Sequence, residues 1–183
     1  MRTFPLESLS LVEAQHKQFA LVDAICRHFP GADFLRGGDF GLASGLNQPR
    51  VTQRVEAVLA DAFHAEAAVL LQGAGTGAIR AAIAALGQPG RTLLIHDAPV
   101  YPTTSVIIEQ MGLKPIRVDF NDLAALSETV AQHRPDAALV QHTRQCPEDS
   151  YRLAEVLSVL NEQHVPTLTD DNYAVMKVAN IGC

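Results

Sequence analysis

The first third of the chain alternates apolar stripes at helical spacing with one long glycine-rich stretch. Ser10 and Glu13 have the spacing of a capping box, and apolar residues then recur near helical period, which predicts a helix to about His28. A second apolar stripe predicts a helix over 49–64, with proline in its first turn. The residues between them, 31–48, are rich in glycine and predict an irregular loop.

From residue 67 onward short apolar runs alternate with helical periods. Strands are expected at 67–71, 92–96, 115–118, 137–141 and 166–169. Helices are expected at 79–86, 102–111, 123–133 and 151–163. This alternation predicts an α/β fold whose mostly parallel sheet is built with right-handed helical crossovers.

Polar or glycine-containing segments follow four of the expected strands. They are Gln72-Gly73, His96-Asp97, Gln141-His142 and Asp170-Asp171. The carboxyl ends of parallel strands meet at one edge of a sheet, where ligands of open α/β folds gather. We therefore expect these segments to share one edge.

The glycine-rich turn after the first expected strand has the composition of an anion site. Gly73, Gly75 and Gly77 let the backbone approach an anion closely, and the amides of a helix start and the Thr76 hydroxyl donate to phosphate oxygens. Two other interpretations stay open. The glycines also suit a tight turn needed only for packing.

The same turn also fits a dinucleotide fingerprint. Gly73, Gly75 and Ala78 match its glycine pattern, and Asp97 follows at the end of the next strand, about 20 residues on. Two helices and a long loop precede this turn, whereas that fingerprint usually follows the first strand of its unit. The dinucleotide interpretation is therefore the second choice.

Aromatic and ionisable side chains are expected at the same edge. Tyr101 lies between Pro99 and Pro102, which stiffen the chain, so its ring is a candidate to stack on a planar ligand or to pack on its own helix. His96 and Asp97 do not predict a metal site, because adjacent strand residues point to opposite faces.

The last expected strand ends on an acid. Asp170 is either the partner of a cation such as a protonated ring nitrogen, or a solvated strand-end acid or helix cap. Gln141, His142, Thr143 and Arg144 supply donors suited to a ring oxygen or a substrate carboxylate, with a surface loop position as the other interpretation of His142.

Composition excludes several classes of function. The 183 residues are 48% hydrophobic and 19% charged, as in ordinary globular proteins, and the net charge of −6 argues against general affinity for nucleic acid or anionic lipid. Three cysteines without metal or disulfide spacing favour a reducing, cytoplasmic location. No stretch approaches the roughly 18 apolar residues of a membrane span, and the N-terminus does not resemble a signal peptide.

Taken in order, these segments resemble the large domain of fold-type-I pyridoxal-phosphate-dependent enzymes, the aminotransferase superfamily with its lyase relatives. The likeness covers nearly the whole chain and is clearest over 47–82, which includes the turn Gly73-Ala74-Gly75-Thr76-Gly77-Ala78. It implies a three-layer αβα fold, with an N-terminal helix and glycine-rich loop at 1–48 and a partial cofactor-binding domain at 49–183. It also implies pyridoxal 5'-phosphate as cofactor, an amino acid substrate and a homodimer.

The resemblance assigns roles to individual positions. Ala74, Gly75 and Thr76 would hold the phosphate, and Tyr101 would stack on the ring. Asp170 would pair with the ring nitrogen, with Asp171 as the competing choice. Tyr173 would reach the ring oxygen, and His142 stands where relatives commonly have an asparagine followed by proline, so it is a further cofactor-binding candidate. Transamination, elimination and retro-aldol cleavage stay open as reactions.

One departure concerns the catalytic lysine. The Schiff-base lysine of the superfamily lies well beyond the aspartate strand, and Lys17, Lys114 and Lys177 do not match it. The catalytic residue is therefore unknown, and we expect an incomplete large domain that is inactive alone and marginally stable or self-associating. A nicotinamide-dependent oxidoreductase and a non-catalytic interaction protein stay open as alternatives.

Overall fold

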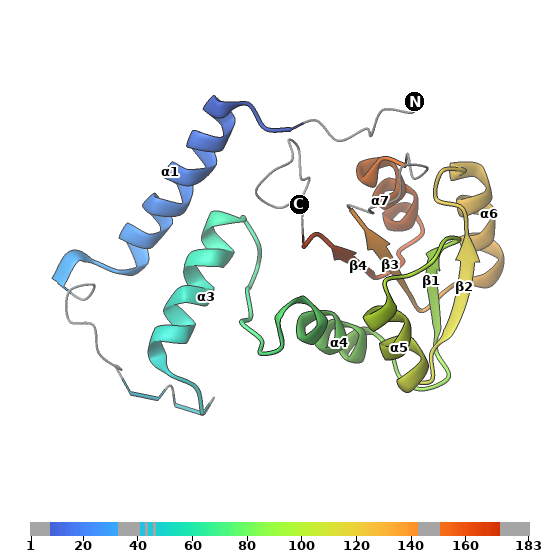
Figure 1. Cartoon of the computed structure of the whole chain (residues 1–183), viewed down its shortest axis with the longest axis horizontal. Coiled ribbons are helices and arrows are strands. Elements are labelled where there is room, and N and C mark those ends of the chain that lie inside the picture. Colours follow the sequence, from blue (N-terminus) through green and yellow to red (C-terminus); the bar gives the residue numbers. More distant parts are fainter. Residues whose placement is uncertain (1–7, 33–40, 43, 46, 143–150, 173–183) are drawn as a thin grey trace. The chain divides into compact units, whose positions relative to one another are not determined.

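The computed structural model describes residues 8–32, 41–42, 44–45, 47–142 and 151–172 (Figure 1). The described residues form two compact units, 8–71 and 72–172, and each is treated by itself. The functional division expected at residue 48 stays a prediction. No helix within these described ranges is both long enough and apolar enough to cross a bilayer.

The unit formed by residues 8–71 contains two long helices that lie side by side (Figure 1). Helix α1, Leu11–His28, begins at the predicted capping box, in which the Glu13 backbone N–H donates to the Ser10 hydroxyl and the Ser10 N–H donates to the Glu13 carboxylate. Helix α3 covers Arg50–Ala62. Both predicted helices are confirmed, although α3 is shorter at each end.

An ion cluster joins the ends of these two helices. The Asp61 carboxylate accepts hydrogen bonds from Arg27 Nε at 2.9 Å and from His28 Nε2 at 3.1 Å. The hydrogen bond from Arg27 holds the pKa of Asp61 below its ordinary value. The capping box and these ion pairs of α1 are therefore formed by residues of the same unit.

The strand predicted at 67–71 is wrong. The segment forms no strand, and the Leu70 N–H donates to the Glu56 carboxylate of α3 at 2.8 Å instead of to a sheet ladder. Val69 is 70% exposed and Leu71 is 48% exposed. A short apolar run becomes a strand only where a neighbouring strand accepts its hydrogen bonds, and here a helix side chain takes that role.

The unit formed by residues 72–172 is a parallel sheet with helices on both faces. Its strands are β1 (Thr92–His96), β2 (Lys114–Val118), β3 (Ala137–Gln141) and β4 (Thr167–Asp170), in the order β2-β1-β3-β4. Its helices are α4 (Ala74–Leu86), α5 (Pro102–Gln110), α6 (Leu123–His133) and α7 (Leu153–Glu162). The predicted α/β class, with its mostly parallel sheet, is confirmed.

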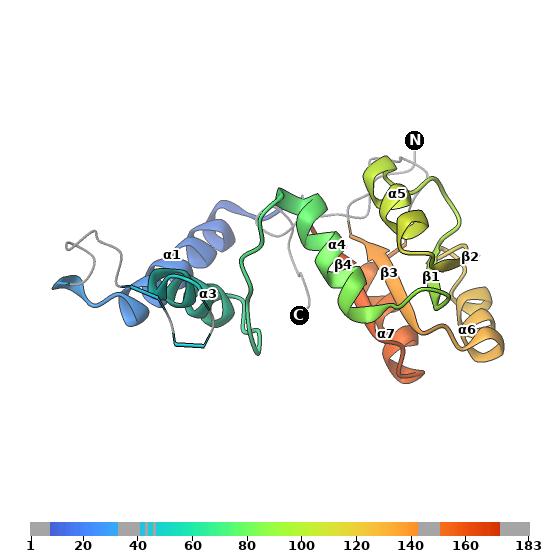
Figure 2. The ribbon, with the colours of Figure 1, turned by 90° about the horizontal axis from the view of Figure 1, so that it is seen from below.

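Helices cover both faces of the sheet (Figure 2), and each face has its own apolar core. Helices α4 and α5 pack Ile83 and Ile107 against Ile95 and its face of the sheet. Helices α6 and α7 cover the other face, where Leu94 and Phe120 are fully buried. Since neighbouring residues of β1 are buried on opposite sides, the middle of this strand, Leu93–Ile95, is a continuous apolar run, as expected for a sheet covered on both faces.

The glycine-rich turn is the first turn of α4 rather than a loop before it. Helix α4 begins at Ala74, five residues before the predicted start at residue 79, and the Gly77 N–H donates to the Gly73 carbonyl at 2.9 Å. Gly73 caps the helix with φ of 95°. A Cβ on Gly77 would lie 2.1 Å from the Gln72 carbonyl oxygen, so this close approach requires glycine.

A hydrogen-bond cluster fastens the amino-terminal ends of β1 and β3. The Asp136 carboxylate accepts from the Thr92 backbone N–H and from the Thr92 hydroxyl, both at 2.8 Å, and from the Arg91 guanidinium. These hydrogen bonds, first those from Thr92, lower the pKa of Asp136 to about 2. Asp136 therefore stabilises the folded state most when its carboxyl group is ionised.

We predict that this cluster makes stability depend on pH on the acid side. Because the folded pKa lies below the unfolded value of about 3.9, the contribution of Asp136 is full above that value and is lost as pH falls toward 2. Denaturant unfolding of Asp136→Asn should show lower stability than wild type at pH 6 and a shrinking difference toward pH 2. Glu128→Gln, which changes an exposed side chain of α6, is the control. A deficit that is the same at both pH values would contradict the prediction.

We predict that Gly77→Ala destabilises the second unit, because its Cβ would overlap backbone. An overpacked site typically costs about 2 kcal/mol, or roughly 4–8 °C in Tm for a chain of this size. Gly75→Ala is the matched control in the same turn, because its Cβ would meet only the Asn172 side chain at an ordinary 3.6 Å. Equal melting temperatures for the two variants would show that the turn is built differently.

Candidate functional site

The start of α4 presents backbone N–H groups to the carboxyl edge of the sheet. The backbone of Gly73 has a left-handed conformation, and Ala74 also has a positive φ of 52°. The chain then continues as a right-handed helix. A change of hand between successive residues turns their N–H groups toward one point, and the first N–H groups of a helix have no partner within it. The N–H groups of Ala74, Gly75 and Thr76 therefore have the arrangement typical of a backbone anion site, at the positive end of a helix dipole.

Two of the three glycines serve the shape of this turn rather than a ligand. The close contact at Gly77 and the left-handed φ of Gly73 are required to start α4 at all. Gly75 has no such constraint, because a Cβ there would meet only ordinary contact distance. The packing interpretation therefore accounts for Gly73 and Gly77, and Gly75 is the glycine left for a ligand.

The start of α5 lies beside the start of α4. The hydroxyl oxygens of Thr103 and Thr76 are 3.5 Å apart, so the first turns of the two helices meet. Tyr101 is the N-cap of α5, and its carbonyl accepts from the Thr104 and Ser105 N–H groups. Tyr101 is 59% exposed, so it is not buried against its own helix and stays accessible to a ligand.

The end of β4 brings a carboxylate to the same face. Asp170 pairs in register with Gln141, one residue pair after Val140 and Thr169 and two after Leu139 and Leu168. Since side chains alternate along a strand, Asp170 projects to the side of Leu139, which belongs to the core under α4 and α5. The Gln141 amide donates to the Asp170 carboxylate at 3.4 Å.

Asn172 links this carboxylate to the glycine turn. Its backbone N–H donates to Asp170 Oδ1 at 3.3 Å, and its side chain lies 3.6 Å from the position that a Cβ on Gly75 would take. The phosphate-type turn and the acid are therefore neighbours, joined through one residue. The structure thus brings together the start of α4, the start of α5 and the end of β4.

His142 and Asp171 form a separate pair. His142 Nδ1 lies 2.7 Å from Asp171 Oδ1, and the two side chains are only 6% and 18% exposed. His142 is therefore not a solvated surface histidine. Asp171 is engaged by the imidazole, which sets it apart from Asp170.

Six of the seven predicted cofactor residues lie at this edge: Ala74, Gly75, Thr76, Tyr101, His142 and Asp170. Tyr173, Thr143 and Arg144 lie outside the described residues. Sequence reasoning missed Thr103 and Asn172, which connect the three elements. The position of Thr103 in the first turn of the helix predicted at 102–111 could have indicated its role. No feature of the sequence indicated the role of Asn172.

Within the described residues of the second unit, the one lysine lies at the edge of the sheet opposite to the candidate site. Lys114 is the first residue of β2, so it lies at the amino-terminal edge of the sheet. Lys17 belongs to α1 in the other unit, and Lys177 lies outside the described residues. In the described part of the chain, no group of three or more His, Cys, Asp or Glu side chains is gathered as for a metal ion.

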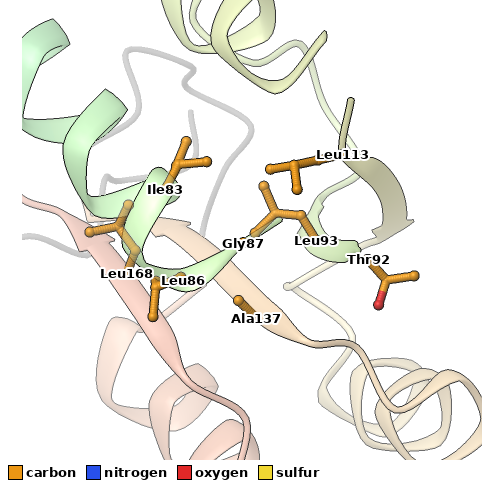
Figure 3. A pocket seen from close by; sticks show the side chains of 8 residues that line it. All are labelled: Ile83, Leu86, Gly87, Thr92, Leu93, Leu113, Ala137 and Leu168. Atoms are coloured by element: carbon orange, nitrogen blue, oxygen red, sulfur yellow. The ribbon is translucent and has the colours of Figure 1, made fainter. Parts of the chain in front are cut away.

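An apolar cavity under α4 is not a ligand site (Figure 3). It is lined by Ile83, Leu86, Gly87, Thr92, Leu93, Leu113, Ala137 and Leu168, and has room for about 10 Å³, roughly one water. It lies near the starts of β1 and β3, away from the strand ends that carry Asp170. We interpret it as a packing gap.

A comparison with protein families connects this geometry to a known group. Residues 32–180 match the family model of aminotransferase class I and II. The chain is also 74% identical over its 183 residues to the uncharacterized protein YhfS of Escherichia coli K12, of which it covers 51%. The chain thus spans about half the length of this curated relative.

Solved structures give the same picture. The crystal structure of the pyridoxal-5'-phosphate-dependent protein YhfS from Escherichia coli superposes with a TM-score of 0.95, over 100% of this chain and 51% of that one. A putative cystathionine β-lyase involved in aluminum resistance, from Clostridium acetobutylicum, superposes with a TM-score of 0.73 at 18% identity, over 89% of this chain and 44% of that one, and shows the shared fold. The chain belongs to the aminotransferase class I and II family.

Proposed function

We propose that the carboxyl edge of the second unit is the phosphate and ring-nitrogen side of a pyridoxal 5'-phosphate site in an enzyme acting on an amino acid. The contact chain that joins the α4 start to Asp170 through Asn172 carries this proposal. A helix start with converging N–H groups suits the phosphate, and a carboxylate on the same face suits a protonated pyridine. The residues present therefore fit the cofactor.

Each side chain has a distinct task in this site. The amides of Ala74, Gly75 and the Thr76 N–H and hydroxyl bind the phosphate, and the exposed Tyr101 ring stacks on the pyridine. The Asp170 carboxylate, steadied by the Gln141 amide, keeps a proton on the ring nitrogen. When bound, the cofactor supplies an electron sink for negative charge at the α-carbon of the amino acid.

The proposal for this chain is binding rather than complete catalysis. Lys114 lies at the opposite edge of the sheet, and the sequence has no lysine between residues 115 and 176. Within the described residues of the second unit no lysine lies at this edge, so none is available there to hold the cofactor covalently or to move a proton at the α-carbon. We therefore expect reversible binding and no turnover by these 183 residues alone.

The dinucleotide alternative finds less support in the geometry. That fingerprint requires a strand directly before its glycines, and residues 67–71 form none. Asp97, its ribose-binding candidate, is exposed and lies at the end of β1. This leaves Asp97 as a useful control residue at the same edge of the sheet.

The finer assignments rest on the family resemblance. We infer an amino acid substrate with transamination, elimination and retro-aldol cleavage as open reactions, a homodimeric and cytoplasmic enzyme, and contacts of His142 and Tyr173 with the cofactor. The sparse cysteines without disulfide spacing support the location, and family membership supports the substrate class.

We predict that Asp170→Asn weakens cofactor binding. The probe is pyridoxine 5'-phosphate, which lacks an aldehyde and so does not react with surface lysines, and equilibrium dialysis gives its Kd. Loss of a charge-assisted hydrogen bond costs about 1.5–3 kcal/mol, or roughly a 10- to 100-fold rise in Kd. Pyridoxine without phosphate should bind wild type far more weakly, since the α4 amides then have no anion.

The matched control is Asp97→Asn, which removes a carboxylate from the same edge. It should leave binding of pyridoxine 5'-phosphate unchanged. Wild type that binds NAD tightly, with affinity lost in Asp97→Asn, and that does not bind pyridoxine 5'-phosphate, would establish the oxidoreductase alternative instead.

A further inference from the structure

The pair formed by His142 and Asp171 lies where the ladder between β3 and β4 ends. The His142 backbone N–H donates to the Asp170 carbonyl at 2.9 Å, one step beyond the last paired residues, Gln141 and Asp170. The imidazole of the same residue then reaches the next carboxylate, at 2.7 Å. His142, the residue directly after β3, thus contacts both Asp170 at the end of β4 and Asp171, the residue that follows it.

The two acids at the end of β4 are divided between two partners. Asp170 meets the Gln141 amide and the Asn172 N–H, on the face that carries the α4 start. Within the described residues Asp171 meets His142, and the side chains of Asp171 and His142 are only 18% and 6% exposed. A mostly buried carboxylate is costly unless it is paired, so the imidazole gives Asp171 a fixed position.

This division matters because strand ends fray. Asp170 is the last residue of β4, and the ladder with β3 ends there, so within the described residues the backbone after it leaves the sheet. A rotation at this point would turn the Asp170 carboxylate away from the α4 face. A short, mostly buried hydrogen bond one residue further on holds the backbone on both sides of Asp170.

We propose that the His142–Asp171 pair is a clasp that aims the Asp170 carboxylate, and that both residues are positioning residues for it. Its effect on the cofactor rests on the proposed function, whereas the clasp itself is a property of the cofactor-free chain. The clasp also selects Asp170 over Asp171 as the ring-nitrogen partner, because the Asp171 carboxylate is already held. It further fixes the histidine tautomer, since a carboxylate accepts and Nδ1 must therefore carry the proton.

The chain offers variants that separate shape from charge. Asparagine places an amide N–H close to where imidazole carries Nδ1, so His142→Asn should keep the hydrogen bond to Asp171. His142→Leu fills similar space and removes the donor. Asp171→Ala removes the acceptor, and Asp171→Leu removes it while filling similar space.

The first experiment needs no cofactor. Nitrogen NMR of the histidine-labelled 183-residue chain should show His142 as the Nδ1–H tautomer, and Asp171→Ala should shift it to the Nε2–H form that free imidazole prefers in water. An unchanged His142 spectrum in Asp171→Ala would overturn the clasp. Asp171→Leu, which removes the acceptor and fills similar space, gives the same comparison should the alanine variant fold poorly.

The second experiment tests whether the clasp positions the Asp170 carboxylate next to the ring nitrogen of the bound probe. With pyridoxine 5'-phosphate labelled at the ring nitrogen, wild type and His142→Asn should show a protonated ring nitrogen. His142→Leu should lose that signal and bind at least about 10-fold more weakly, as an interaction of about 1.4 kcal/mol implies. His142→Leu that binds with a fully protonated ring would overturn the positioning role. Wild type that binds no probe would refute the proposed function and leave the first experiment to decide on the clasp.

Discussion

The register in which β4 pairs with β3 is the constraint on which the site depends. It sets Gln141 beside Asp170 and sends both side chains to the face covered by α4 and α5. A slip of one residue would move Asp170 to the opposite face and bring Asp171 toward the start of α4. The register is held by Leu139 and Leu168 on one side and by Val140 on the other, so the apolar core decides where the acid points.

A second constraint comes from the backbone at the start of α4. The left-handed Gly73 and the close approach at Gly77 let the helix begin five residues earlier than its apolar period suggests. This early start carries the first N–H groups of the helix to the strand ends, next to Asn172. Core packing and turn geometry thus place the anion-binding amides and the carboxylate as neighbours.

Much of the fold could be predicted from the sequence because its signals are local. The capping box at Ser10 and the apolar alternation of residues 92–141 each specify an element without knowledge of its neighbours. The run at 67–71 misled because it is equally apolar, and only a partner strand decides whether such a run joins a sheet. His142 and Asp170 followed from strand ends, which share an edge in any parallel sheet, whereas the glycine turn was predicted from its composition and follows no strand. The different roles of Asp170 and Asp171 could not be predicted without the strand register. The contact through Asn172 could not be predicted without the three-dimensional structure.

The family gives the site a chemistry, and the sequence limits what these residues do alone. Members of this group of structures include a pyridoxal-5'-phosphate-dependent relative that the chain matches over its whole length. The chain spans about half of that relative, and Lys114, the described lysine of the second unit, lies at the amino-terminal edge of the sheet. The described residues therefore supply groups suited to hold a cofactor, whereas no described lysine of the second unit lies at the carboxyl edge of the sheet for the covalent steps.

A crystal structure of the 183-residue chain with pyridoxine 5'-phosphate tests the central claim most directly. We predict the phosphate at the amides of Ala74, Gly75 and Thr76, and the ring nitrogen within hydrogen-bond distance of Asp170. A ring nitrogen paired with Asp171, or a phosphate bound away from the start of α4, would contradict the account.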